Sequence, residues 1–489
     1  MSAAGGRYFL ETMGCQMNRL DSELVAGQLR ALGYEPAGGP DDADIVLINT
    51  CSVRQHAEDK VYSRLGELRQ LKRRRADMLI GIIGCMAERD GDAILSECEH
   101  VDLLCGPNQL ARVPELIQAV LAERQRPVAL MENQSRKLSP AERSLALDSL
   151  EAIDLNRVIP TDGSVLQSYV RVQRGCDKFC SFCVVPFTRG PEVGRPPANI
   201  VQESQRLADA GAKEITLLGQ TVNSYAYQEN GRTVRFAELL ARVHAVSGIE
   251  RLRFVTSYPG DFTDDILEAM RDLPKVCEYL HIPAQSGSNT VLERMKRHYT
   301  AEQYVDLIER ARAIVPGISL AGDFIVGFTG ETDDDFEKTV ALVERVRYSN
   351  TFIFKYSPRP GTAADRRLAD DVPPAVKRER NMRLLDVQKR ISLADRQRFI
   401  GETLEVLVEG FSKAAIKAQD AEQTRGHEVG WRRSDQLTGR TRGDEIVVFT
   451  GPASLIGRFV GVRITAATAL TLHGDVVEKT EQSPLPVTP

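Results

Sequence analysis

The chain has 489 residues, which is too long for one ordinary domain and predicts two to four folding units. Its 42% hydrophobic and 27% charged residues are typical of globular proteins and exclude a chain that is disordered throughout. A net charge of −5 argues against a protein that coats nucleic acid by bulk charge, although not against a local basic patch. No leader-like start is visible, and the longest apolar run, near residues 78–86, is about half of the roughly 20 residues that span a bilayer. We therefore expect a cytoplasmic protein with no membrane partner.

In residues 1–125, three strand-like runs each lead into a cysteine, and a helical stretch follows each one. The runs and cysteines are Arg7–Thr12 with Cys15, Asp44–Asn49 with Cys51, and Met78–Ile83 with Cys85. Because carboxyl ends of parallel strands meet at one edge of a doubly wound sheet, we expect these thiols to meet in space and to be able to hold a metal centre. The alternative is that they are simply buried, as free cysteine often is. Cys105 also follows a strand-like run, Val101–Leu104, and is therefore a possible fourth ligand, but we assign it, like Cys98, to the core.

Residues 126–164 are polar and weakly patterned, which predicts a linker. Over residues 165–397, short β-rich runs alternate with amphipathic helical stretches, which predicts βα units around a parallel sheet. The six strand candidates are Ser168–Gln173, Glu214–Leu218, Arg251–Thr256, Glu278–Ile282, Ser319–Val326 and Asn350–Tyr356. Six units fall short of a closed eightfold barrel, so we predict a partial (βα)6 barrel whose chemistry lies at the carboxyl ends of its strands.

The first of these strands runs into a CxxxCxxC loop formed by Cys176, Cys180 and Cys183. Thiolates are ligands for zinc or iron–sulfur clusters, and a structural zinc site takes four of them where this loop supplies three. Three ligands on a four-iron cluster leave one iron open, which is the arrangement that a radical S-adenosylmethionine (SAM) enzyme needs to bind SAM. The alternative is zinc, or thiols with only a structural role. Cys277 is assigned to the core.

A basic helical run over Pro373–Arg398 leads into residues 398–478, whose short β-runs and glycine-rich turns predict a small β-barrel. The predicted strands are Glu402–Glu409, Glu445–Thr450, Phe459–Thr465 and Ala469–Val477. Two groups of basic residues are candidate RNA contacts or simply solvated faces: Lys413, Lys417, Arg432, Arg433, Arg440 and Arg442, and, in the first unit, Lys72–Arg75. Residues 479–489 are predicted to be a disordered tail.

Seven motifs carry a family resemblance. They are Thr12–Asn18 with Asp21 and Glu23, Asn49–Arg54, Gly84–Glu88, Arg174–Gly190, Leu218–Asn223, His281–Gly287 and Asp323–Glu331. On these motifs the chain resembles, over residues 7–478, the radical SAM methylthiotransferases, in the branch that modifies prenylated adenosine in tRNA. Its last unit resembles the RNA-binding barrel called TRAM. Gly194 and Thr329 stand where the family commonly has serine and proline, and residues 420–436 resemble an insertion.

The resemblance implies methylthiolation of C2 of N6-(dimethylallyl)adenosine at position 37 of tRNA, giving 2-methylthio-N6-(dimethylallyl)adenosine. It implies two [4Fe–4S] clusters, a radical SAM cluster on Cys176, Cys180 and Cys183 and an auxiliary one on Cys15, Cys51 and Cys85, with SAM as radical source and methyl donor. Expected contacts with SAM or adenine are Phe182, Gln220, Asn223, Ser257, Gln285 and Asp323. Arg189 and Arg195 are expected to bind the SAM carboxylate or RNA phosphate, or to form ion pairs.

The expected partners are the tRNA anticodon arm carrying prenylated adenosine, a reductant such as flavodoxin or ferredoxin, and a sulfur or cluster donor, with the enzyme acting as a monomer. Two alternatives stay open at this point. The same chemistry can act on threonylcarbamoyl-adenosine in tRNA or on an aspartate of a ribosomal protein. A non-enzymatic alternative is a zinc-stabilised RNA-binding protein.

Overall fold

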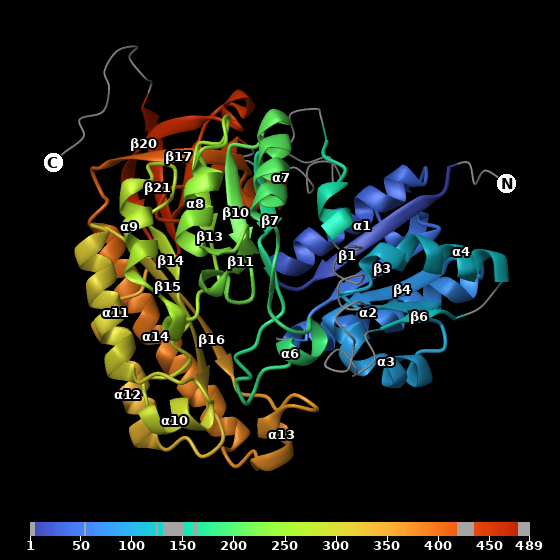
Figure 1. The fold of residues 1–489 in the computed structure, drawn as a ribbon, viewed down its shortest axis with the longest axis horizontal. Helices are drawn as coiled ribbons and strands as arrows, with labels where there is room; N and C mark the ends of the chain where they lie inside the picture. The colour runs from blue at the N-terminus through green and yellow to red at the C-terminus, as the bar shows by residue number, and fades with distance from the viewer. Residues whose placement is uncertain are drawn as a thin grey trace.

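The computed structural model describes residues 5–52, 55–123, 126–130, 151–160, 165–417 and 435–477. Figure 1 shows two α/β units side by side and a small barrel packed at one end of the second unit. The predicted tail at residues 479–489 and all but the end of the predicted insertion lie outside the described residues. Within the described part of the chain, no helix combines the length and apolar character needed to cross a membrane.

The first unit is built on a six-stranded sheet with the order β2-β1-β3-β4-β5-β6, in which every neighbouring pair is parallel. Its strands are β1 (Arg7–Met13), β2 (Glu35–Pro36), β3 (Ile45–Thr50), β4 (Leu79–Gly84), β5 (Leu103–Cys105) and β6 (Val128–Ala129). The order reverses between β1 and β3, so the switch point of this sheet lies there. The predicted doubly wound parallel sheet is confirmed.

Helices cover both faces of this sheet. They are α1 (Gln16–Ala31), α2 (Gln55–Arg74), α3 (Cys85–Glu97) and α4 (Val113–Glu123), with short turns η1 (Pro40–Asp42) and η2 (Leu110–Arg112). Residues of α2 and α3 pack with Val46 and Ile80 on one face, and residues of α1 and α4 pack with Leu47 and Ile83 on the other. Burial on both faces explains why β3 and β4 read as continuous apolar runs and not as alternating ones.

The second unit contains six parallel strands, as predicted. They are β7 (Gln167–Arg171), β10 (Glu214–Leu218), β13 (Arg251–Phe254), β14 (Tyr279–His281), β15 (Ser319–Val326) and β16 (Asn350–Lys355). They form two groups, β13-β10-β7 and β14-β15-β16, joined by a parallel bridge between Leu252 and Val276 and by the Ser257 N–H donating to the His281 carbonyl (3.1 Å). Among the described residues no strand pairs β16 with β7, so the barrel is open.

Most of the barrel helices lie outside the strands, the shortest ones lie at one end of the barrel, and α14 runs along β16 (Figure 1). They are α6 (Val185–Thr188), α7 (Pro197–Asp209), α8 (Phe236–His244), α9 (Asp264–Asp272), α10 (Asn289–Arg294), α11 (Ala301–Ile314), α12 (Asp333–Val346), α13 (Ala363–Arg367) and α14 (Pro374–Gln397). Small additions are β8 (Gln173–Arg174) with β9 (Val193–Gly194), the hairpin of β11 (Ala226–Glu229) and β12 (Arg232–Arg235), η3 (Val222–Ser224) and η4 (Pro259–Asp261). The sequence did not predict α9, nor α10 and the hairpin, whose elements of four to six residues are too short to show a clear periodic pattern.

The third unit is a closed five-stranded barrel with the order β17-β18-β19-β21-β20, which confirms the predicted small β-barrel. Its elements are β17 (Thr403–Phe411), β18 (Gln436–Arg440), β19 (Ile446–Thr450), η5 (Ala453–Leu455), β20 (Phe459–Ala467) and β21 (Thr471–Val477). It caps the amino ends of the central strands: Arg251 donates to the Arg440 carbonyl (2.7 Å) and Arg253 to the Arg442 carbonyl (2.8 Å). The carboxyl ends of the strands therefore lie at the opposite end of the barrel.

Part of the proposed basic patch takes part in this packing. Arg442 forms an ion pair with Glu278 (2.7 Å), in the second unit, and Arg440 pairs with Asp444 (2.9 Å). Arg432 and Arg433 lie outside the described residues, and Lys413 and Lys417 are exposed. Arg442 thus ties the third unit to the second, Arg440 is paired within its own unit, and neither arginine is an unpaired cation.

Candidate functional site

The three strand-end cysteines of the first unit lie at the switch point of its sheet. Cys15 caps the amino end of α1 directly after β1, Cys51 follows β3, and Cys85 is the first residue of α3 after β4. A side-chain hydrogen bond with Cys51 lowers the pKa of Cys15 to about 6, against the effect of burial and with help from the positive charge of Arg189. Burial raises the pKa of Cys85. The sheet therefore brings thiols together that are widely separated in sequence.

Gly84, directly before Cys85, lets the end of β4 lie close to the end of β3. It adopts φ +95°, and a Cβ atom there would lie 2.4 Å from Asn49 Oδ1 and 2.6 Å from the Thr50 carbonyl oxygen. Asn49 in turn donates to the Asn18 carbonyl (2.8 Å) and accepts from Asn18 Nδ2 (2.9 Å). These buried contacts fix the turns after β1, β3 and β4 against one another, and with them the positions of the cysteines.

Arg189 connects this cysteine set to the central barrel. It ends α6, shortly after the CxxxCxxC loop, and its Nε donates to Cys85 Sγ (3.3 Å). Its Nη2 forms a buried ion pair with Asp21 of α1 (2.8 Å). Of the roles expected for Arg189, the structure shows the ion pair together with a thiol contact. The strand-end cysteines consequently face the carboxyl end of the central barrel.

The loop cysteines lie at that end of the barrel. The Val185 N–H donates to Cys183 Sγ (3.5 Å), and Arg297 Nη1 donates to Cys180 Sγ (3.4 Å). Burial raises the pKa of Cys176 to about 11 and that of Cys183 to about 12. Nowhere in the described ranges do three His, Cys, Asp or Glu side chains converge with the spacing that one metal ion requires. Thiolates are the ligands that iron–sulfur clusters take, so the chemistry of the three loop cysteines fits such a cluster.

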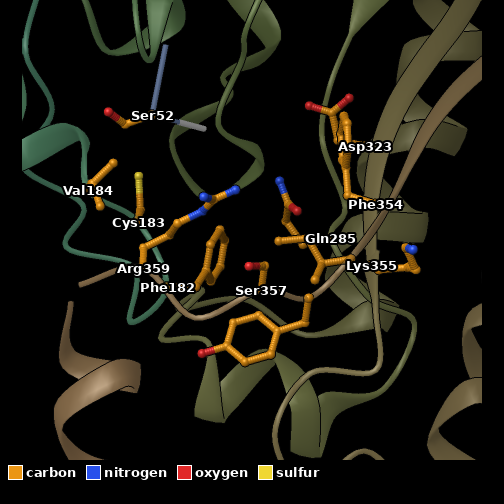
Figure 2. Close-up of a pocket in the computed structure, with 12 residues that line it drawn as sticks. Ser52, Phe182, Cys183, Val184, Gln285, Asp323, Phe354, Lys355, Ser357 and Arg359 are labelled. Carbon is orange, nitrogen blue, oxygen red and sulfur yellow. The ribbon is translucent and has the colours of Figure 1, made fainter. Parts of the chain in front are cut away.

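A cavity of about 130 Å³ joins the two units (Figure 2). It is lined by Ser52, Phe182, Cys183, Val184, Gln285, Asp323, Ile325, Phe354, Lys355, Tyr356, Ser357 and Arg359. Ser52 directly follows the strand-end Cys51, whereas Cys183 belongs to the loop set. Figure 2 shows Ser52 and Cys183 on one side of the cavity and Asp323 on the other. The same cavity therefore adjoins both cysteine sets.

Three of the six side chains expected to contact SAM or adenine, Phe182, Gln285 and Asp323, line this cavity. Gln220, Ser257 and Gln285 each have a buried side-chain oxygen with no hydrogen-bond partner among the described residues, and so does Ser52. A buried polar atom without a partner is unfavourable, so these oxygens fit a bound polar ligand such as SAM.

Phe182 and Asn223 also make contacts within the protein. The Phe182 ring packs edge-to-face against Phe328 with 6.3 Å between centroids. The Asn223 amide donates to the Tyr258 carbonyl (2.9 Å) and accepts from the Tyr258 N–H (2.7 Å). The Asn223 side chain therefore ties η3 to the loop after β13.

Asp154 is at the centre of a buried ionic network at the interface, which the sequence analysis did not identify. Its carboxylate accepts from Arg171 and Arg174, both at 2.6 Å, and Arg171 also pairs with Asp21 of α1 (2.8 Å). Burial raises the pKa of Asp154, but the charges of Arg171, Arg174 and Arg195 outweigh it and hold the pKa well below its usual range. The available signal was a pair of arginines, Arg171 and Arg174, at the end of β7 and just beyond it, next to the cysteine loop.

Arg195 belongs to the same network. It pairs with Glu151 and Glu203, each at 2.8 Å, which is the ion-pair role among those expected for it. Asp154 and Glu151 both come from the predicted linker, in which residues 151–155 are helical. This stretch is therefore packed between the first unit and the barrel.

Comparison with known proteins matches one family model to each of the three units. The uncharacterized protein family UPF0004 matches residues 7–106, the radical SAM superfamily matches residues 170–343, and the TRAM domain matches residues 428–477. A tRNA-2-methylthio-N(6)-dimethylallyladenosine synthase from Rhodopirellula baltica is 47% identical, over 96% of this chain and 95% of its own length. A protein of the same name from Moorella thermoacetica is 41% identical, over 96% of this chain and 97% of its own.

Among solved structures, the fold is similar to that of TsrM, a radical S-adenosylmethionine methyltransferase from Kitasatospora setae with cobalamin and a [4Fe-4S] cluster bound. The TM-score is 0.51 at 14% identity, and the match covers 74% of this chain and 77% of the other. This likeness supports the arrangement of the fold, and the close relatives carry the family assignment.

Proposed function

The chain belongs to the family of tRNA-2-methylthio-N(6)-dimethylallyladenosine synthases, and from this premise we propose that it methylthiolates C2 of N6-(dimethylallyl)adenosine at position 37 of tRNA. The observation that carries the proposal is the cavity shared by the two cysteine sets, with Cys183 in its wall and Ser52, next to Cys51, opposite the barrel strands. A reaction that joins a sulfur atom to a carbon needs the radical source and the sulfur source at the same substrate carbon. Both cysteine sets must therefore adjoin one cavity.

We assign Cys176, Cys180 and Cys183 to the [4Fe–4S] cluster that binds SAM, and Cys15, Cys51 and Cys85 to the auxiliary [4Fe–4S] cluster. When bound, the clusters and SAM would supply the radical that abstracts the C2 hydrogen, the sulfur that takes its place and the methyl group. The chain holds the two sets facing one another through the Arg189 contacts with Cys85 and Asp21. An aromatic C–H has no useful acidity, so no general base among the lining residues is required.

The cavity residues are proposed to bind and orient SAM. Phe182 offers an aromatic face and Gln285 an unpartnered amide oxygen in the wall, while Gln220 and Ser257 offer buried oxygens at neighbouring strand ends. Asn223 is proposed to act indirectly, since its amide holds the Tyr258 backbone.

Buried ion pairs exclude water where the two units meet. Glu58 of α2 accepts from Arg359, which lines the cavity, and from Arg89 of α3, both at 2.8 Å. Together with the Asp154 network, these contacts keep water out of the interface between the first and second units. Exclusion of water protects reactive species from side reactions, which radical chemistry requires.

Recognition of RNA is proposed to combine the third unit with an unstacked target base that enters the barrel. A reductant such as flavodoxin or ferredoxin and a sulfur or cluster donor are the other proposed partners of the monomeric enzyme. The charge of −5 is consistent with recognition by local contacts and shape and not by bulk charge.

The test is anaerobic reconstitution followed by iron and sulfide quantitation and nucleoside analysis of prenylated tRNA. We expect iron and sulfide for two clusters, and a methylthio nucleoside that requires SAM and reductant. Zinc without sulfide would contradict the enzyme assignment. Activity on threonylcarbamoylated tRNA or a ribosomal protein, but not on prenylated tRNA, would contradict the substrate assignment.

A further inference from the structure

Ser52 is a fully buried serine in the wall of the cavity that the first unit and the barrel share. It directly follows Cys51, two residues beyond the end of β3. Its hydroxyl has no hydrogen-bond partner among the described residues. A buried hydroxyl without a partner is unfavourable, so its presence indicates a ligand that completes the hydrogen bonding. We therefore expect a polar group of a ligand beside Cys51.

Other buried polar side chains at this edge of the sheet are satisfied within the protein. The Ser22 hydroxyl accepts a hydrogen bond from the Asn49 amide (2.9 Å). The Thr50 hydroxyl, from the residue before Cys51, donates to the Ile83 carbonyl (2.8 Å). These hydroxyls hold neighbouring strand ends together. The Ser52 hydroxyl makes no such contact with the described residues, so the fold does not account for it.

Two stronger donors near the strand-end cysteines are already in use. The Asn18 amide donates to Asn49 Oδ1 (2.9 Å). The Arg189 guanidinium donates to Cys85 Sγ (3.3 Å) and also pairs with a carboxylate of α1. The hydrogen of the Ser52 hydroxyl is not accepted by any described group, so it is available to a ligand.

The side of the cavity on which Ser52 lies indicates which ligand this is. The unpartnered oxygens of Gln220, Ser257 and Gln285 belong to the barrel, and we propose them for SAM. Ser52 belongs to the first unit, and Figure 2 shows it on the opposite side of the cavity from Asp323. The ligand of Ser52 therefore lies next to the strand-end cysteines, which we assign to the auxiliary cluster.

We propose that the Ser52 hydroxyl donates a hydrogen bond to the sulfur atom that the auxiliary site supplies to the substrate. A thiolate sulfur accepts hydrogen bonds, and hydrogen bonds to an ionised acceptor are the stronger ones. Where buried ion pairs exclude water, a donor for this sulfur has to come from the protein. This inference rests on the proposed function and adds a residue that binds the sulfur.

The test is a titration of the reduced, anaerobic holoenzyme with methanethiolate, followed by EPR of the auxiliary cluster. An uncleavable SAM analogue in excess occupies the loop cluster, and no RNA is present. Ser52→Ala is compared with Ser22→Ala, which makes the same chemical change at a partnered hydroxyl of the same unit. We expect Ser52→Ala to weaken methanethiolate binding by about tenfold or more, the usual size for a hydrogen bond to a charged group. Ser22→Ala should bind methanethiolate as the wild type does.

Iron content and urea midpoints separate binding of sulfur from a role in the fold. Because its hydroxyl has no partner in the described protein, Ser52→Ala should keep the iron content and the urea midpoint of the wild type. Ser22→Ala should lower the midpoint, since Asn49 loses an acceptor. A Ser52→Ala enzyme that loses iron or stability would overturn the proposal. Unchanged methanethiolate binding in Ser52→Ala would also overturn it, whether or not the KM for SAM rises.

The same titration distinguishes this inference from the proposed function, because it contains no RNA. A wild-type enzyme that binds methanethiolate but does not modify prenylated tRNA would contradict the proposed substrate, and the affinity of Ser52→Ala would still decide the role of Ser52. A wild-type enzyme that forms no auxiliary cluster would contradict the proposed function and this inference together.

Discussion

The loop cysteines and the strand-end cysteines differ in what brings them together. Cys176, Cys180 and Cys183 are neighbours in sequence, so a single loop places them. Cys15, Cys51 and Cys85 are neighbours only because β1, β3 and β4 are adjacent and parallel, with their carboxyl ends at one edge. The first site therefore depends on local chain geometry and the second on correct folding of a whole sheet.

Removing each set of cysteines in turn should separate SAM cleavage from methylthiolation. Changing Cys176, Cys180 and Cys183 to alanine together should abolish both SAM cleavage and methylthiolation. Changing Cys15, Cys51 and Cys85 to alanine should abolish methylthiolation and leave SAM cleavage, because the loop site does not depend on them. Mass spectrometry of 5′-deoxyadenosine and of tRNA nucleosides measures both. A strand-end triple variant that still methylthiolates would contradict the assignment.

The interface that holds the two sets face to face should be the next most sensitive feature. Asp154→Ala leaves the buried guanidinium groups of Arg171 and Arg174 without their shared partner. We expect a loss of about 3–5 kcal/mol in the free energy of unfolding, measured by anaerobic urea denaturation. Asp395→Ala, which removes an exposed ion pair with Arg347, is the control and should cost no more than about 1 kcal/mol. Equal losses would argue against a central role for the network.

Gly84→Ala should disturb only the sheet-assembled site. The new Cβ would overlap Asn49 Oδ1 and the Thr50 carbonyl, which displaces the turn that carries Cys85. Gly33, with φ +88° and nothing within 4 Å of its Cβ position, is a matched control in the same unit. Gly33→Ala should cost about 1–2 kcal/mol and keep both clusters. We expect Gly84→Ala to cost more and to lose the auxiliary iron; the same iron content in both variants would contradict this.

The two arginines that donate to thiols offer a more limited test. Arg189 donates to Cys85 and Arg297 to Cys180, so each alanine variant should weaken binding of its own cluster only. A loss of about 10–100-fold in cluster affinity is expected, since partners of metal ligands usually have effects of that size. Anaerobic chelator titration with EPR of each cluster measures it. An Arg189→Ala enzyme that loses the loop cluster would show that the two sites are not independent.

The sequence predicted the parallel sheets, the open barrel and the cysteine positions because these depend on apolar runs and on residues next to strand ends. It did not predict the Asp154 network, since an acidic residue in a polar stretch shows no sign of burial before the chain is folded. The contacts of Arg442 were also hidden, because a basic residue can equally be solvated or paired. Long-range ionic partners are set by packing and leave little local pattern.

Cys105 should be less sensitive than the strand-end cysteines, and it tests what distinguishes them from other cysteines of the same sheet. It is the last residue of β5, opposite Ile83, so it lies within the sheet, whereas Cys15, Cys51 and Cys85 lie beyond their strands. Its side chain packs in the core with Leu29 and Leu116, and burial raises its pKa. Cys105→Ala should keep the iron of both clusters and lower the free energy of unfolding by about 1 kcal/mol. Cys85→Ala, measured in the same iron analysis, should lose one cluster. The comparison tests whether a cysteine in this sheet must lie beyond the end of its strand to be a cluster ligand. Loss of a cluster in Cys105→Ala would show that this position is not required.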